Sequence, residues 1–150
     1  MALDASLSNT GIAIVDKHKQ IIKLHTISTK PTASLGSRLI EISTTIEELI
    51  KQYNIELILL EGQYMGGSLQ CGFVLGNIYR IAEEQRLAVK TYQPTTIKKV
   101  VTGSGKAKKS DMKKYIEEIF NLKARSNEHV RDALGLVHTY FVKEGVMYGR

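Results

Sequence analysis

The chain has 150 residues, of which 43% are hydrophobic, enough apolar surface for one core but too little for two. We therefore expect one domain over residues 1–150. No run reaches the roughly 20 apolar residues of a membrane helix, and Asp4 interrupts the region where a signal peptide would be apolar. The lone Cys71 excludes an internal disulfide and a zinc ribbon. These features predict a cytoplasmic protein without a membrane partner.

The chain is basic, with a formal net charge of +6 and a pI near 9.4. The region from Lys98 to Arg125 holds nine basic and three acidic residues, so its excess of six equals the whole net charge. A concentrated positive charge favours a polyanionic partner such as nucleic acid. The alternative is a solvated helix face that binds nothing.

Short apolar runs alternate with helical patterns, which favours an α/β fold. The apolar runs predict strands at residues 2–4, 11–15, 20–28, 57–61 and 88–92. Helical spacing predicts helices at 39–53, 68–84, 110–120 and 126–143. Residues 16–19 form a turn of hairpin length, so the first three strands should be an antiparallel meander. The run 57–60 is apolar at consecutive positions, as expected for a strand covered on both faces.

Three carboxylates occupy positions that could converge at one edge of this sheet. Asp4 ends the first strand, Glu61 ends the fourth, and Asp132 lies near the start of the last helix. Carboxylates held side by side need a cation, and oxygen ligands suit Mg²⁺ or Mn²⁺. Two such ions about 4 Å apart can drive phosphodiester hydrolysis. Spacing alone leaves open that the three carboxylates never meet.

The last helix carries two further candidates. His129 precedes Asp132 by three residues, so both side chains lie on one helical face, where the imidazole could bind metal or move a proton. Glu128 competes for the same role. Its alternative explanation is favourable interaction with the helix dipole in the first turn, after Ser126 as the N-cap.

Gly72 and Gly76 lie one turn apart on the helix predicted at 68–84. Two glycines on one helical face allow another element to approach closely. That element could be a helix of the same chain or a second copy of the protein, and the spacing does not distinguish them.

Several segments together resemble the motifs of one family, the RuvC-type Holliday junction resolvases. The resemblance runs over nearly the full length, and the order and spacing of the segments also fit. The segments are LDASLSNTG at 3–11, SRL at 37–39, LEGQYM at 60–65, TGSGKAKKS at 102–110 and HVRDAL at 129–134.

This resemblance implies an RNase H-like fold, with a five-stranded mixed sheet of three antiparallel strands followed by parallel ones, flanked by helices. It implies a homodimer that makes paired, symmetric nicks across a four-way DNA junction. The cofactor would be Mg²⁺, with Mn²⁺ as a substitute and two ions in each active site.

The resemblance also assigns roles to residues at matching positions. Asp4, Glu61 and Asp132 take the acidic positions, and His129 matches a position where family members carry Asp or His. All four would bind metal and act in catalysis.

Basic and aromatic residues take the DNA-binding positions. Lys98 and Lys109 fall where the family uses lysines near the scissile phosphate, with Lys109 also catalytic. Lys106 and Lys108 belong to the glycine and lysine loop that contacts DNA. Tyr64 matches an aromatic that stacks on a base at the crossover, with packing on the next helix as the alternative.

The chain departs from the family pattern at its opening motif, which reads Asp-Ala-Ser where many members have Asp-Pro-Gly. With the resemblance, this departure implies a divergent branch of the family, encoded in a bacterial cell or by a phage. Few residues precede Asp4, which leaves the rigidity of the first strand open. Two other functions fit much of the same pattern: an RNase H-like nuclease that processes ribosomal RNA, and a junction-binding module without catalysis. A nucleotide-binding domain of the actin-like class also shares the topology, but it normally needs a second domain.

Overall fold

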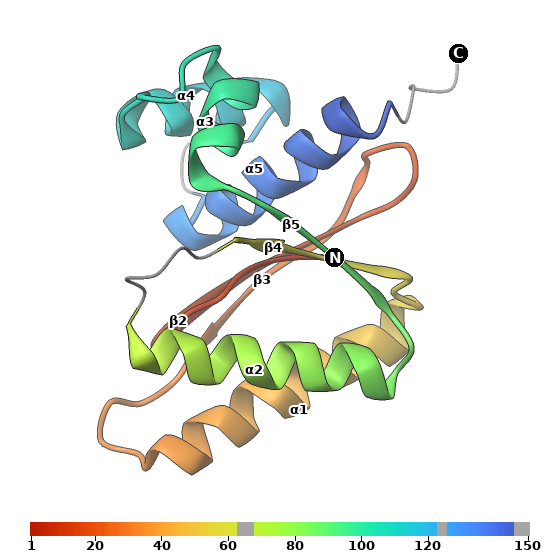
Figure 1. Cartoon of the computed structure of the whole chain (residues 1–150), viewed down its shortest axis with the longest axis vertical. Helices are drawn as coiled ribbons and strands as arrows, with labels where there is room; N and C mark the ends of the chain where they lie inside the picture. The colour runs from red at the N-terminus through yellow and green to blue at the C-terminus, as the bar shows by residue number, and fades with distance from the viewer. Residues whose placement is uncertain (63–67, 123–125, 146–150) are drawn as a thin grey trace.

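The computed structural model describes residues 1–62, 68–122 and 126–145. Five strands form one sheet in the order β3-β2-β1-β4-β5 (Figure 1). The strands are β1 (Ala2–Asp4), β2 (Asn9–Val15), β3 (Ile21–Ser28), β4 (Leu57–Glu61) and β5 (Ala88–Tyr92). The helices are α1 (Leu35–Tyr53), α2 (Leu69–Glu84), α3 (Pro94–Thr102), α4 (Lys109–Ile119) and α5 (Glu128–Lys143).

The sheet lies between two helical layers, with α1 and α2 on one face and α3, α4 and α5 on the other (Figure 1). β1 is central, antiparallel to β2 and parallel to β4, and β4 is parallel to β5. The predicted α/β class and mixed sheet are therefore confirmed. Within the described residues, no helix is long and apolar enough to cross a membrane.

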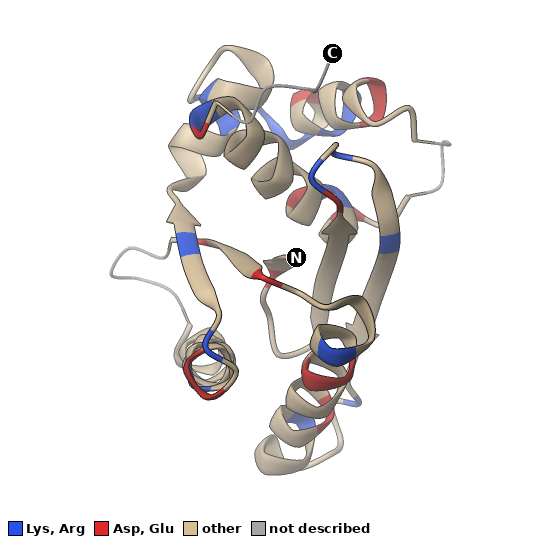
Figure 2. Ribbon diagram, turned by 90° about the vertical axis from the view of Figure 1, so that its right-hand side faces the viewer, with Lys and Arg blue, Asp and Glu red and all other residues tan. Residues whose placement is uncertain are grey.

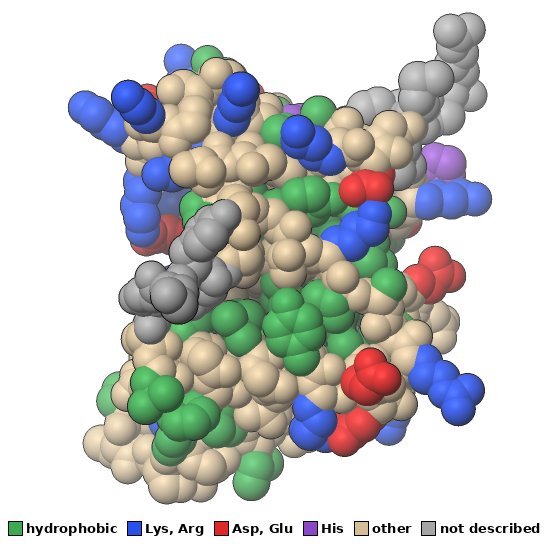
Figure 3. All heavy atoms as spheres, viewed as in Figure 1, with side chains coloured by type: hydrophobic (Ala, Val, Ile, Leu, Met, Phe, Trp, Pro, Cys, Tyr) green, Lys and Arg blue, Asp and Glu red, His purple; other side chains and the backbone are tan. Residues whose placement is uncertain are grey.

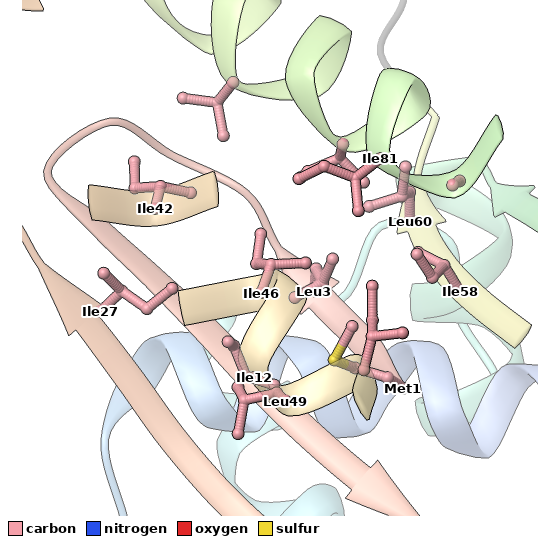
Figure 4. Close-up of a cluster of buried hydrophobic side chains, with 14 of the residues drawn as sticks. Met1, Leu3, Ile12, Ile27, Ile42, Ile46, Leu49, Ile58, Leu60 and Ile81 are labelled. Atoms are coloured by element: carbon pink, nitrogen blue, oxygen red, sulfur yellow. The ribbon is translucent and has the colours of Figure 1, made fainter. Parts of the chain in front are cut away.

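Alternate strand residues build two separate cores. Leu3, Ile12 and Leu60 point toward α1 and α2, where they pack with side chains such as Ile46 (Figure 4). Their neighbours Ala2, Ala13 and Leu59 point to the opposite face, where α5 packs. A strand with both faces buried needs apolar residues at consecutive positions, as its sequence has.

Small residues let α5 lie close to the centre of the sheet. Ala2 pairs with Ala13 across β1 and β2, and both are fully buried under the α5 layer. Nearer the edge, a Cβ atom added to Gly11 would lie 2.1 Å from the His129 carbonyl oxygen. Only a glycine fits there, because real Cβ atoms cannot approach a backbone atom so closely.

The structure differs from the predicted elements in one omitted helix and in several element boundaries. The predicted helices omitted α3, whose sequence is rich in β-branched residues that favour helix weakly and begins with proline at the first helical position. β2 begins at Asn9, two residues earlier than predicted, because the Asn9–Ser28 pairing extends the β2–β3 ladder. α1 begins at Leu35, ahead of Gly36, because the Ser34 hydroxyl caps it by accepting a hydrogen bond from the Ser37 amide.

The contact between Gly11 and α5 can be tested by substitution. Gly11→Ala should lower the free energy of unfolding by about 1–3 kcal/mol or more, because the added methyl group displaces the start of α5. Gly36→Ala is the matched control: its added Cβ meets nothing within 4 Å, and it lies in helix α1. The control should stabilise the protein by about 0.5–1 kcal/mol. Equal stability of the two variants in urea denaturation would contradict the close docking of α5.

Candidate active site

Asp4 and Glu61 lie at the same edge of the sheet. Leu3 pairs with Leu60 in the parallel β1–β4 ladder, so the residues that follow them, Asp4 and Glu61, end neighbouring strands. Asp4 is half-buried and Glu61 is exposed at the rim. Carboxyl ends of adjacent strands thus supply two of the predicted site residues.

The turn that follows Asp4 is held by its own hydrogen bonds. The Thr10 hydroxyl donates to the Ser6 carbonyl oxygen at 2.7 Å, and the Ser6 hydroxyl donates to the Asn9 carbonyl oxygen at 2.7 Å. Thr10 is fully buried, and so is Leu3, directly before Asp4. β1 is short, but its central position and this turn fix the backbone of Asp4 on both sides.

Helix α5 brings His129 to Asp4. The His129 Nδ1 atom lies 2.9 Å from the Asp4 Oδ2 atom. The helix begins at Glu128, and the Asn127 side chain accepts a hydrogen bond from the His129 amide at 2.8 Å. Asn127 is therefore the N-cap, and the prediction of Ser126 was wrong. Asp132 lies one turn further along α5 and is half-buried.

Burial, and then neighbouring carboxylates, raise the pKa values of the three carboxyl groups. Burial and the Asp4 charge raise the pKa of Asp132 to about 6. Partial burial, then the charges of Asp4 and Asp132, raise the pKa of Glu61. Burial also raises the pKa of Asp4, while the hydrogen bond and charge of His129 oppose this. The effect of Asp4 on Asp132, and of both on Glu61, shows that the three groups lie within electrostatic range of one another.

The donor set suits a hard divalent cation, since it combines three carboxylates with one imidazole. In the part of the chain that is described, however, no three His, Cys, Asp or Glu side chains are already close enough to enclose one ion. One oxygen of Asp4 and Nδ1 of His129 face each other instead. Metal binding would therefore require the side chains at this edge, such as Asp4 and His129, to rotate away from their present contact.

Two lysines reach the carboxylates from α3 and α4. Lys98 is half-buried on α3, and its charge lowers the pKa of Glu61, against the larger upward effect of burial. Lys109 is the first residue of α4, and its charge lowers the pKa values of Asp4 and Asp132. Lys106 and Lys108 are exposed in the connection between α3 and α4. Tyr64 lies outside the described residues.

Residues 1–140 match the family model described as crossover junction endodeoxyribonuclease RuvC. The chain belongs to the RuvC family. The family member from Rickettsia typhi is 29% identical over 95% of this chain and 96% of its own length. The member from Corynebacterium diphtheriae is 28% identical over 91% and 89% of the two chains.

Solved structures show the same fold. The Thermus thermophilus RuvC structure in complex with a Holliday junction substrate has a TM-score of 0.81 and 22% identity, covering 96% of this chain and 94% of that one. The yeast mitochondrial Holliday junction resolvase has a TM-score of 0.62 and 12% identity, covering 97% and 79%. At these identities the structural likeness establishes the fold alone.

Two contacts beside the RuvC motifs were not predicted. A Cβ atom added to Gly62 would lie 2.7 Å from the Gln93 side-chain nitrogen, so Gln93 covers the backbone directly after Glu61. The Lys109 Nζ atom lies 2.5 Å from the Glu128 Oε1 atom. Gly62 next to an acidic motif residue was the available signal for the first contact. The second joins residues 19 positions apart and has no sequence signature.

The raised pKa of Asp132 predicts a pH-dependent stability without metal. The folded protein binds the Asp132 proton more tightly than the unfolded chain does, so this group's contribution to stability falls as pH rises from the unfolded value near 4 through about 6. Asp132→Asn should therefore stabilise the protein at pH 8 by about 1 kcal/mol after solvent screening. The gain should shrink toward pH 4. Thermal unfolding in EDTA measures it, and an equal gain at both pH values would contradict the raised pKa of Asp132.

Proposed function

We propose that this chain resolves four-way DNA junctions by paired, symmetric hydrolysis of phosphodiester bonds, and that Asp4, Glu61, His129 and Asp132 bind its divalent ions. The observation that carries the proposal is the convergence of these residues at one sheet edge in a chain that matches the RuvC family. As a member of that family, the chain is a nuclease. We place its activity on cellular DNA in the cytoplasm.

The metal-binding part of the proposal rests on the chemistry of the donor set. When bound, Mg²⁺ or Mn²⁺ as a pair supplies an activated water and stabilises the leaving oxygen. Asp4 and Glu61 approach from the sheet, and Asp132 and His129 approach from α5. Before metal binds, His129 holds Asp4 through the contact between Nδ1 and Oδ2.

The DNA-binding part rests on the positions of the lysines. Side chains of Lys and Arg project around the outer end of the layer that contains α3 and α4 (Figure 3), and basic segments recur along these helices (Figure 2). Lys98 and Lys109 lie on the side of this layer nearest the carboxylates, so they would offset the charge of the scissile phosphate. Lys106 and Lys108 would bind flanking phosphates, and Tyr64 is proposed to stack on a base from its sequence motif alone.

The homodimer is proposed to form through the first half of α2. Leu69 is 75% exposed and Phe73 is 40% exposed, on the same side of the helix by their spacing. Cβ atoms added to Gly72 and Gly76 would meet nothing within 4 Å. Hydrophobic side chains cover this part of the surface (Figure 3, lower left). A second copy is the occupant that fits, because two symmetric nicks need two active sites and each chain has one.

The function is tested with a synthetic four-way junction and Mg²⁺. Wild type should nick opposite strands symmetrically, and Glu61→Gln should bind the junction without nicking it, because the amide is a poor metal ligand. Glu56→Gln is the matched control, since Glu56 is exposed just before the opposite end of β4. This control should cleave like wild type.

Other outcomes favour other functions. Equal cleavage by wild type and Glu61→Gln would overturn the metal-site assignment. Cleavage of structured RNA in preference to the junction would favour a ribosomal-RNA-processing nuclease. Tight junction binding by wild type without any nicking would favour a non-catalytic module.

The dimer interface is tested by charge insertion. Phe73→Glu should convert the dimer to a monomer in sedimentation velocity, because it places a charge in an apolar contact. Ile22→Glu makes the same kind of change at an exposed apolar residue of β3 and should leave the dimer intact. A Phe73→Glu variant that stays dimeric, or a monomeric wild type, would remove α2 as the interface.

A further inference from the structure

The first residues of α4 and α5 meet within electrostatic range of Asp4 and Asp132. Lys109 begins α4 and Glu128 begins α5. Their side chains form an ion pair with 2.5 Å between Nζ and Oε1. The next residue after Glu128 is His129, which contacts Asp4. This ion pair therefore joins Lys109 of α4 to α5, the helix that carries His129 and Asp132.

Lys109 needs such a partner to hold one position. Its side chain is 87% exposed, and a solvated lysine with four rotatable bonds samples many rotamers. Among the lysines between Lys98 and Lys114, Lys109 is the one with an ion pair in the described part of the chain. The pair keeps the ammonium group close enough for its charge to act on Asp4 and Asp132.

The Glu128 carboxylate also repels the phosphate groups of DNA. Glu128 is 51% exposed, and its negative charge acts on Asp4 and Asp132. A phosphate group that approaches Lys109 meets this charge, which weakens the attraction of the basic surface. Glu128 thus has two opposite effects, one on the position of Lys109 and one on DNA affinity.

Resting on the proposed nuclease function, we propose that Glu128 is a positioning residue that holds Lys109 toward the scissile phosphate, at the expense of some affinity for DNA. On this account Glu128 does not touch the substrate. It acts through Lys109: one N–H of the ammonium group keeps the Glu128 contact while another is free to donate to the phosphate when the junction binds.

The proposal predicts opposite changes in binding and in rate. Glu128→Gln should bind a fluorescent four-way junction in EDTA about two- to fivefold more tightly, because one repelling charge is removed. Its single-turnover cleavage rate with Mg²⁺ should fall by about two- to fivefold, because Lys109 loses the ion pair that holds its side chain in one position. Glu118→Gln makes the same charge change at an exposed α4 residue that has no ion pair within the described residues. This control should cleave at the wild-type rate.

A double-mutant cycle shows whether Glu128 acts through Lys109. In a Lys109→Gln background, Glu128→Gln should cause no further loss of rate. The proposal is overturned if Glu128→Gln cleaves like wild type, or if its rate loss persists without Lys109. The thermal midpoint of each variant detects loss of the favourable helix-dipole interaction of Glu128. That loss would lower stability, but it would not produce tighter junction binding together with slower cleavage.

Failure of the proposed function would look different. If wild type does not nick junctions at all, the nuclease assignment fails, whereas the affinity measurements in EDTA still test the charge effect of Glu128. If wild type nicks and Glu128→Gln shows neither tighter binding nor slower cleavage, only the positioning role fails.

Discussion

The close docking of α5 on the centre of the sheet is the constraint on which the candidate site depends. Gly11 has no side chain where the His129 backbone passes, and the paired residues Ala2 and Ala13 leave room further along the helix. A larger residue at any of these positions would lift α5 away from β1. Because α5 carries His129 and Asp132, packing at these small residues sets the distance between the helical and the sheet ligands.

Charge repulsion follows from that packing. Asp4, Glu61 and Asp132 are brought into electrostatic range before any cation is present, and burial, followed by the Asp4 charge, raises the pKa of Asp132 to about 6. The fold therefore holds its carboxylates in an unfavourable arrangement, which a divalent ion would relieve. Lys98 and Lys109 offset part of the charge from the other side, and their charges would then face the phosphate.

Much of the fold could be predicted because local pattern and tertiary structure agree. The apolar run at 57–60 became a central strand, and the periodic residues of α1, α2 and α5 became the buried faces of helices. Helix α3 could not be predicted in this way, because its nine residues are too short and too rich in threonine and valine for a clear signal. Its stability comes from packing on α5, where Ile97 and Val101 are buried. The acidic residues of the candidate site could be named from motif spacing, whereas the pairing of Lys109 with Glu128 depends on where two helices happen to begin.

The central claim is that Asp4, Glu61, His129 and Asp132 form one cation site, and direct measurement of metal binding tests it most closely. Isothermal titration calorimetry with Mn²⁺ at pH 7.5, without DNA, compares wild type with Asp132→Asn and with the exposed α1 control Glu48→Gln. We expect wild type and the control to bind Mn²⁺ alike, and Asp132→Asn to bind it at least about 10- to 100-fold more weakly, since loss of a residue that only supports a metal ligand already weakens binding by that much. Equal Mn²⁺ affinity in wild type and Asp132→Asn would contradict the account.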